Sequence, residues 1–307
     1  MGRFVNGQML EELKQILSEE QVFSEEPMNR HTTFRVGGPA EALVQPEAGQ
    51  ISAVVDWCHV HGIPYTVIGN GSNLLVSDRG LSGVVIEFGK PASGIRIEGR
   101  LIYAEAGAML SKVANDAAHA GLTGMEFASG IPGTIGGAVF MNAGAYGGEM
   151  SRIIREVLVL TPEGEKKKLS VEELEVGYRH SCIQERGYIV LSAVLELETG
   201  DEKEILAAME ELKRKRVEKQ PLEYPSAGST FKRPEGHFAG KLIMDAGLRG
   251  FSVGGAAVSE KHCGFVVNKG GATAADIVAV MRHVQEEVKR QFGVTLEAEV
   301  RKLGEFA

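Results

Sequence analysis

The feature that most constrains this chain is its glycine content, above all in one long run. The residues from Phe127 to Gly148 carry no charge and include seven glycines together with Pro132. This run is long enough to cross a bilayer, but a lipid-exposed helix is not built with so much glycine and proline. We therefore expect a buried loop region whose backbone packs closely against another chain segment or a flat ligand. Glycine makes up 39 of the 307 residues, roughly 13% against an average of about 7%, so tight turns are expected elsewhere too.

Charge and composition narrow the classes of partner. The chain has 33 Lys+Arg against 41 Asp+Glu, a net charge of −8, so we expect no nucleic-acid partner and no membrane insertion, and any phosphate must be held by local geometry. The length indicates about two domains. Three cysteines far apart, Cys58, Cys182 and Cys263, predict neither a disulfide framework nor a metal site. Because no secretory signal is visible at the N-terminus, a cytoplasmic protein is expected.

Periodicity and turn residues predict alternating helices and strands. The amphipathic pattern of residues 1–28 predicts one surface helix. A parallel βαβ unit is expected next, with strands at 42–45 and 65–68 around a helix that ends before Gly62. Further helices are expected at 110–120, 201–219 and 274–292, and further strands at 84–88, 95–98, 101–105, 156–160, 189–197 and 294–303. Together these elements indicate an α+β protein.

Two glycine-rich loops are candidates for binding a ligand. Gly69-Asn70-Gly71-Ser72-Asn73 follows a predicted strand, and its backbone N–H groups can converge on an anion. The same residues also suit an Asn-Gly hairpin turn, and both interpretations stay open. The second loop runs from Ser129 to Ala138 and continues through Asn142–Gly147. Because the Rossmann and P-loop patterns are both missing, two such loops favour a large phosphorylated cofactor held in another way.

Three further features allow both a functional and a structural interpretation. Ser229 lies in a small-residue loop without a Gly-x-Ser-x-Gly pattern, and such a serine is most often a cap or turn residue. Glu297, Glu299 and Arg301 share one face of the last predicted strand, where a solvated sheet edge is the favoured interpretation. The run Lys213–Arg216 is flanked by glutamates and is typical of a solvated helix face.

Taken together, these motifs resemble the UDP-N-acetylenolpyruvoylglucosamine reductase family, flavoenzymes of bacterial peptidoglycan precursor synthesis that support cell wall biogenesis, cell shape and cell division. The likeness runs from His31-Thr32-Thr33-Phe34 to Glu299-Val300-Arg301 and includes both glycine loops, Tyr178-Arg179 and Ala227–Phe231. It implies an FAD-binding fold of the vanillyl-alcohol-oxidase type, with two α+β lobes, over residues 1–200. A smaller α+β substrate domain would cover 201–292, and the strand in 293–307 would return to the active site.

The resemblance also implies a reaction. NADPH would reduce a non-covalently bound FAD, which would pass hydride to UDP-N-acetylglucosamine enolpyruvate and give the lactyl ether of UDP-N-acetylmuramate. Hydride addition pushes negative charge onto the substrate carboxylate, and a fixed cation stabilises charge that exists only after that step. By motif position, Arg179 and Glu299 would stabilise the enediolate-like intermediate. Ser229 would protonate the adjacent carbon.

Other site residues follow from the same resemblance, and no obligate protein partner is inferred. Those expected to bind FAD are Gly69, Asn70, Gly71, Ser72, Asn73, Ser129, Gly130, Ile131, Pro132, Gly133, Thr134, Gly137, Ala138, Asn142, Gly144, Ala145, Tyr146 and Arg216. Those expected to bind substrate are Lys219, Lys232 and Arg233. The chain resembles the shorter branch of the family, which lacks a Tyr-bearing insertion that closes over the substrate. Arg233 stands where some relatives have an amide side chain.

Two alternatives to this function are distinguishable. Another flavoenzyme on the same fold, such as a 2-hydroxy-acid or alcohol oxidase, would share the FAD loops but lack the set Arg179, Ser229 and Glu299. A non-catalytic nucleotide-binding protein would purify colourless and consume no NADPH.

Overall fold

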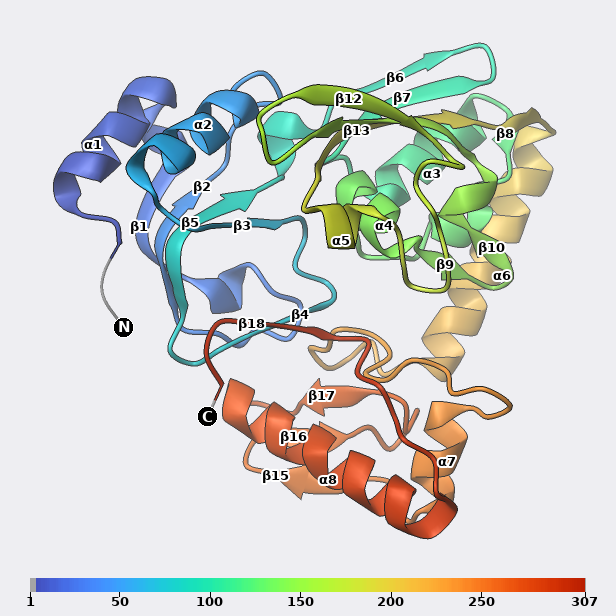
Figure 1. The fold of residues 1–307 in the computed structure, drawn as a ribbon. Coiled ribbons are helices and arrows are strands. Elements are labelled where there is room, and N and C mark those ends of the chain that lie inside the picture. The colour runs from blue at the N-terminus through green and yellow to red at the C-terminus, as the bar shows by residue number, and fades with distance from the viewer. Residues whose placement is uncertain (1–3, 307) are drawn as a thin grey trace.

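The computed structural model describes residues 4–306 and divides into two lobes and a C-terminal unit (Figure 1). The first lobe (residues 4–88) is built on a four-stranded sheet in the order β1-β2-β5-β3. Its strands are β1 (Val22–Pro27), β2 (Pro39–Val44), β3 (Tyr65–Ile68) and β5 (Leu81–Glu87). β5 lies between β2 and β3 and is parallel to both, as expected for a βαβ unit. Helix α2 (Ile51–His61) connects β2 to β3 and ends at Gly62, whose φ of 62° is left-handed.

The second lobe (residues 95–199) carries a five-stranded antiparallel sheet in the order β12-β11-β13-β7-β6. Its strands are β6 (Ile95–Glu98), β7 (Leu101–Glu105), β11 (Ile154–Leu160), β12 (Lys166–Ser170) and β13 (Ile189–Glu196). The lobe also holds helices α3 (Leu110–His119), α4 (Ile135–Met141) and α5 (Ile183–Arg186) and the short strands β8 (Leu122–Thr123), β9 (Gly144–Ala145), β10 (Gly148–Glu149) and β14 (Glu198–Thr199). One continuous hydrophobic core runs through both lobes.

Helix α6 (Glu202–Lys219) leads from the second lobe to the C-terminal unit (Figure 1). It begins where the Asp201 side chain accepts hydrogen bonds from two backbone N–H groups. Ile205 and Met209 of this helix are buried in the core of the two lobes. The division predicted at residue 201 stays a prediction, and the packing of α6 joins its first half to the two lobes.

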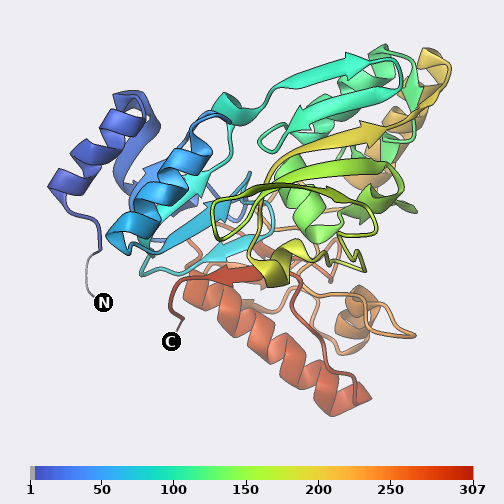
Figure 2. The same cartoon turned by 45° about the horizontal axis from the view of Figure 1, so that its top comes forward.

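The C-terminal unit (residues 220–300) has a three-stranded antiparallel sheet of β15 (Ser252–Val253), β16 (Ala256–Val258) and β17 (Val266–Asn268). Helices α7 (Ala239–Asp245) and α8 (Ala274–Phe292) complete it. Its core also takes in Phe34, Val36 and Leu75 from the first lobe. The chain then returns to that lobe, where β18 (Arg301–Leu303) pairs in parallel with β4 (Leu74–Val76), as Figure 2 also shows.

Two sequence-based expectations about elements are wrong. Within the described part of residues 1–28 only α1 (Gly7–Ile16) is an α-helix, because the chain from Val22 onward forms β1 and pairs with β2. The strand predicted at 294–303 is paired in a sheet only at β18, although Ala298 makes a single bridge to Phe231. The alternating apolar pattern does reflect burial, because Leu296 and Val300 lie in the core of the C-terminal unit.

The other predicted elements are confirmed with ends within three residues of those observed. No helix among residues 4–306 combines the length and the apolar character needed to cross a membrane. Cys58, Cys182 and Cys263 are buried free thiols. The run Lys213–Arg216 is a solvated helix face at Lys213, Arg214 and Lys215, which pair with glutamates of α6, whereas Arg216 turns inward.

Candidate active site

A cavity of about 980 Å³ lies where the two lobes and the C-terminal unit meet. Its walls come from residues 30–35 and 65–74 of the first lobe, 131–145 and 179–190 of the second, and 222–229 with Glu299 and Arg301 from the C-terminal side. Pockets of this size hold large organic ligands. The two glycine loops and the three predicted catalytic residues all contribute to this one space.

The Gly69–Asn73 loop is not a hairpin turn. It joins β3 to β4, and these strands belong to different sheets, because β3 pairs with β5 and β4 with β18. Within residues 4–306 the backbone N–H groups of Asn70, Gly71, Ser72 and Asn73 donate to no protein acceptor. Four free donors in a row along a cavity wall, with Gly71 in the left-handed region at φ 59°, form a site suited to an anion such as a pyrophosphate.

Contacts from both lobes fix the position of this loop. The Asn70 side-chain amide donates to the carbonyl oxygen of Pro132 at 2.7 Å. A Cβ at Gly69 would overlap the hydroxyl of Thr134, so the two glycine loops touch directly. The loops therefore form one continuous wall of the cavity.

Glycines of the second loop serve two purposes. Gly136 packs closely against another segment of the chain, since a Cβ at this position would lie 3.1 Å from the Cβ of Ala106. Gly137 is open, with only the Thr134 hydroxyl at 3.7 Å from such an atom, and it lines the cavity. The Thr134 hydroxyl accepts from the Gly137 N–H at 3.4 Å and so caps the first turn of α4. Both interpretations of the glycine run, close chain packing and contact with a ligand, thus apply to neighbouring residues.

Four residues expected in the cofactor site do not line the cavity. The hydroxyl of Ser129 donates to the carbonyl oxygen of Glu126, and Gly130 packs against Arg216. Asn142 is buried, and its amide bonds to the backbone of Gly177 and Ser151. Tyr146 is exposed outside the cavity lining. The cofactor-site residues that do line the cavity are Gly69, Asn70, Gly71, Ser72, Asn73, Ile131, Pro132, Gly133, Thr134, Gly137, Ala138, Gly144, Ala145 and Arg216.

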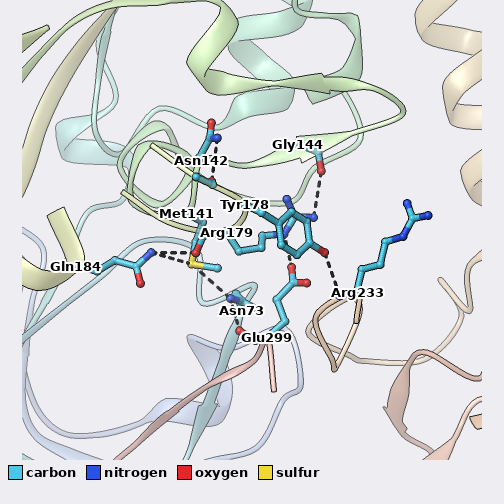
Figure 3. A network of polar contacts seen from close by, with 10 residues as sticks. Asn73, Met141, Asn142, Gly144, Tyr178, Arg179, Gln184, Arg233 and Glu299 are labelled. Carbon is cyan, nitrogen blue, oxygen red and sulfur yellow. Dashed lines mark hydrogen bonds and ion pairs between the residues drawn. The ribbon is translucent and has the colours of Figure 1, made fainter. Parts of the chain in front are cut away.

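Arg179 and Glu299 meet at the centre of the site (Figure 3). Arg179 Nε donates to Glu299 Oε1 at 2.6 Å, and Arg179 Nη2 donates to the carbonyl oxygen of Gly144 at 3.3 Å. The side chains of this ion pair are only 21% and 12% exposed. Glu299 is therefore not part of a solvated sheet edge.

Asn73 connects the cofactor loop to the segment that carries Glu299. Its side-chain amide donates to the carbonyl oxygen of Glu299 at 3.0 Å (Figure 3). The backbone carbonyl of Asn73 accepts from the N–H of Arg301 at 2.9 Å. On the other side, the N–H of Glu299 donates to the carbonyl oxygen of Thr230 at 2.9 Å. The position of Glu299 is thus set from both the first lobe and the C-terminal unit.

Ser229 lies in the cavity wall beside this segment. Within residues 4–306 its hydroxyl has no hydrogen-bond partner, so Ser229 is neither a helix cap nor a turn-stabilising serine. The neighbouring Thr230 is fully buried, and its hydroxyl accepts from the N–H of Val266 at 2.8 Å. Thr230 therefore anchors the backbone and leaves the Ser229 hydroxyl available to a ligand.

Of the three predicted substrate-binding cations, only Lys232 lines one of the two cavities. Lys232 pairs with Glu297 at 3.3 Å and lines a second cavity of about 340 Å³ that shares Arg179 and Glu299 with the first. The backbone N–H of Arg233 donates to the Tyr178 hydroxyl at 3.2 Å, across the gap between the second lobe and the C-terminal unit (Figure 3). Lys219 is exposed at the end of α6 and lines neither cavity.

Arg216 and Arg301, two of the arginines in the cavity wall, have no carboxylate partner among residues 4–306. Desolvation lowers the pKa of both Arg216 and Arg301, because burial disfavours the charged form. Arg301 stacks on the Phe140 ring at 4.4 Å. The sequence analysis did not select Arg301 as a site residue, although it shares the Glu299 face. With the free N–H groups and the open Gly137, these cations fit an extended anionic cofactor such as FAD.

Comparisons with known proteins agree with this site. A sequence model described as "FAD binding domain" matches residues 40–170. The fold alone is shared with an alkyldihydroxyacetonephosphate synthase, at a TM-score of 0.50 and 13% identity over 65% of this chain and 42% of that one. Fold and site together define an FAD-containing flavoprotein of the vanillyl-alcohol-oxidase fold type.

A sequence match over the C-terminal unit identifies the particular family. Residues 220–303 match the model described as "UDP-N-acetylenolpyruvoylglucosamine reductase, C-terminal domain". Reductases of that name from Agathobacter rectalis and Lachnoclostridium phytofermentans are 56% and 53% identical, over 93% and 98% of this chain and 95% and 99% of theirs. The crystal structure of the reductase from Thermus caldophilus superposes with a TM-score of 0.80 at 38% identity and covers 91% of this chain and 97% of that one. The chain belongs to the UDP-N-acetylenolpyruvoylglucosamine reductase family.

Proposed function

We propose that Arg179, Ser229 and Glu299 are the catalytic residues of this reductase. The protein is an FAD-containing, NADPH-dependent oxidoreductase of peptidoglycan precursor synthesis. It reduces the enolpyruvyl group of UDP-N-acetylglucosamine enolpyruvate to the lactyl ether of UDP-N-acetylmuramate. We further propose that it works in the cytoplasm without an obligate protein partner.

The cofactor would be held by backbone more than by side chains. The free N–H groups of Asn70–Asn73 would bind the pyrophosphate, and Ile131–Thr134 with Gly137 would line the rest of the flavin nucleotide. Arg216, half-buried without a carboxylate partner, would contribute the nearest positive charge from α6. A flavin bound there would supply the hydride chemistry, as acceptor from NADPH and donor to the terminal carbon of the enolpyruvyl group.

Arg179 would act on the charge that hydride addition creates. The enolpyruvyl carboxylate becomes part of an enediolate-like anion, and a cation already fixed in place stabilises that anion without reorganisation. The hydrogen bonds of Arg179 to Glu299 and to the carbonyl oxygen of Gly144 fix its guanidinium in this way. Glu299 would lie in the same anion site, held there by the hydrogen bond from Asn73 to its backbone carbonyl. Because an ionised carboxylate repels an anion, Glu299 would stabilise it only when protonated or suitably hydrogen-bonded.

Ser229 would complete the reaction by donating its hydroxyl proton to the carbon next to the carboxylate. A hydroxyl is a weak acid, but an enediolate is a strong enough base to accept its proton. The observation that supports this role is a hydroxyl in the cavity wall without a protein partner, on the same backbone that binds the segment of Glu299 through Thr230.

The C-terminal unit would bind the nucleotide part of the substrate. Lys232 and Arg233 would supply positive charge for its phosphates, with Lys219 at the outer rim. We propose that residues 201–292 form the substrate domain and that 293–307 return the chain to the active site. The hydrogen bond between Arg233 and Tyr178 would then lie over the bound substrate, where some relatives use an inserted tyrosine.

An anaerobic visible spectrum tests the proposed function directly. We expect purified protein to show a flavin spectrum that bleaches with NADPH and returns when UDP-N-acetylglucosamine enolpyruvate is added. A flavin that bleaches but does not return would assign the fold to another oxidoreductase. Protein that stays colourless after addition of FAD would contradict the cofactor as well.

The Ser229→Ala variant tests the proton donor. We expect the rate of substrate reduction to fall by about 10²–10⁴, the usual contribution of a general acid, while NADPH still reduces the flavin at the wild-type rate. Ser252→Ala, an exposed serine of β15 outside the cavity lining, is the matched control and keeps full activity. Normal turnover of Ser229→Ala would show that another group donates the proton.

A further inference from the structure

A buried ion cluster lies behind the Gly69–Asn73 loop. His31 Nδ1 is 3.0 Å from both carboxylate oxygens of Glu87 on β5, and His31 Nε2 is 3.1 Å from Oε1 of Glu26 on β1. The Gln45 amide also donates to Glu87 Oε2, at 2.6 Å. The side chains of His31, Glu26 and Glu87 are between 11% and 15% exposed. The catalytic mechanism proposed above does not use this cluster.

The geometry of the cluster favours a charged histidine. A neutral imidazole has one N–H and one lone pair, so it can donate to only one carboxylate, whereas an imidazolium donates from both nitrogens. The hydrogen bond to Glu87 raises the pKa of His31 against the opposing effect of desolvation, and Glu26 adds to the rise. The stabilisation is therefore complete below the ordinary histidine pKa of about 6.5 and is lost as the pH rises through the raised value.

His31 also contacts the anion-binding loop through its backbone. A Cβ at Gly71 would overlap the carbonyl oxygen of His31, so the two backbones are in direct contact. Two residues on, the N–H of Thr33 donates to the carbonyl oxygen of Gly71 at 3.3 Å. Residues 31–33 thus support the loop from behind, and they line the same cavity.

We propose that His31 is a positioning residue for the cofactor: clamped between Glu26 and Glu87, it holds residues 31–33 against Gly71 and keeps the N–H groups of Asn70–Asn73 aligned for the phosphates of FAD. The proposal rests on the FAD site described above and not on the enolpyruvyl substrate. Among residues 4–306 the other charged group paired with the cluster is Arg30, whose guanidinium is 3.5 Å from Glu26, and Arg35 follows on the same segment of chain. Arginines do not titrate near neutral pH, so His31 is the group that makes FAD affinity fall as the pH rises.

A titration of the apo full-length protein with FAD, followed by flavin fluorescence between about pH 6 and pH 9, tests this role. We expect the wild-type dissociation constant to rise about tenfold or more over this range, the effect of losing a charged hydrogen bond. His31→Gln should bind FAD about tenfold more weakly already at pH 6 and lose most of the pH dependence. The matched control is His61→Gln, which removes another histidine–glutamate pair, His61 with Glu12 at 3.0 Å, outside the cavity lining; it should follow the wild type.

Wild-type affinity of His31→Gln at pH 6, or an unchanged pH profile, would overturn the proposal. If His31→Gln does not fold, as judged by far-UV circular dichroism, Glu26→Gln provides the second test, because it keeps the histidine but removes one of its carboxylates. Its FAD affinity should begin to fall at a lower pH than that of the wild type, and an unshifted profile would overturn the proposal equally. Protein that binds FAD with the expected pH dependence but does not reduce the enolpyruvyl compound would contradict only the proposed function.

Discussion

Arg179 shows how much of the site depends on a single residue in an unusual conformation. Its φ of 58° lies in the left-handed region, which costs a residue with a side chain about 1–3 kcal/mol and persists only where the surroundings enforce it. Here Gln184 donates to the carbonyl oxygen of Arg179 at 3.2 Å, and the bridge between Gly177 and His180 closes the turn. The strain directs the guanidinium toward Glu299.

Arg179→Lys should separate charge from geometry. A lysine keeps the positive charge but cannot donate to Glu299 and to the carbonyl oxygen of Gly144 from one planar group. We expect kcat for substrate reduction to fall by about 10²–10³, as when one preorganised donor to a developing anion is lost. The reduction of flavin by NADPH, measured by stopped-flow absorbance, should change little. Arg155→Lys, an exposed arginine of β11 paired with Glu196 at 3.3 Å, is the control, and equal kcat values in the two variants would rule out this role for Arg179.

At the scale of elements, the sequence predicted those helices and strands whose ends are marked by local capping and turn residues. Helix α8 begins at a capping box made by Thr273 and Asp276 and ends at Gly293, and the sequence analysis placed both ends correctly. β1 was missed because its residues Glu25, Glu26 and Pro27 look like surface chain, and only pairing with β2 makes them a strand. The end of the chain was overpredicted for the opposite reason, since burial against the C-terminal unit gives residues 294–300 a strand-like alternation without a partner strand.

The Gly69–Asn73 loop gives a prediction at this scale. Gly71 and Gly62 have similar left-handed conformations, with φ of 59° and 62°, but only Gly71 has backbone in the way of a side chain. Gly62→Ala should cost about 1–2 kcal/mol of unfolding free energy, the price of left-handed backbone alone. Gly71→Ala should cost more and should purify with little flavin, because residues 31–33 and the loop must move apart. The measurements are urea denaturation and visible flavin absorbance, and full flavin content in Gly71→Ala would contradict the proposed phosphate-binding role.

At the scale of the whole molecule, the lobes and the C-terminal unit are not independent bodies. Phe34, Val36 and Leu75 belong to the first lobe but lie in the core of the C-terminal unit. The carboxylate of Asp78 accepts hydrogen bonds from the N–H groups of Ala274 and Ala275 and so caps α8 across the boundary. The active site therefore lies at an interface between the lobes and the C-terminal unit, and the two sides of this interface fold together.

Phe34→Ala tests this coupling. Phe34 is fully buried, and its removal should cost about 3–5 kcal/mol while the apo protein still unfolds in a single calorimetric transition. Phe292→Ala, at an exposed position of α8, should change stability by less than about 0.5 kcal/mol. Two separate transitions, with only one of them shifted in Phe34→Ala, would show that the units fold independently.

The catalytic centre could not be predicted from local sequence alone, because its parts meet only in the folded chain. Arg179 and Glu299 are 120 residues apart in sequence, and no spacing rule links them; the family resemblance supplied that pairing. The same resemblance predicts Asn142 and Ser129 in the cofactor site, which stays a prediction, and in the structure their side chains bond to nearby backbone. His31 opens the stretch that resembles the family, but nothing in the sequence indicated its pairing with Glu26 and Glu87, since Glu87 lies 56 residues further along the chain.

The parallel pairing of β4 with β18 has a consequence for the order in which the site is built. Asn73 and Glu299 are 226 positions apart, so a growing polypeptide contains the whole glycine loop long before it contains the segment that bonds to Asn73. Until residue 301 has been synthesised, β4 has no partner strand and Asn73 has no Glu299 carbonyl to bond to. During synthesis the cofactor loop is therefore without this support until more than 200 further residues have been added, as the separation of 226 positions implies.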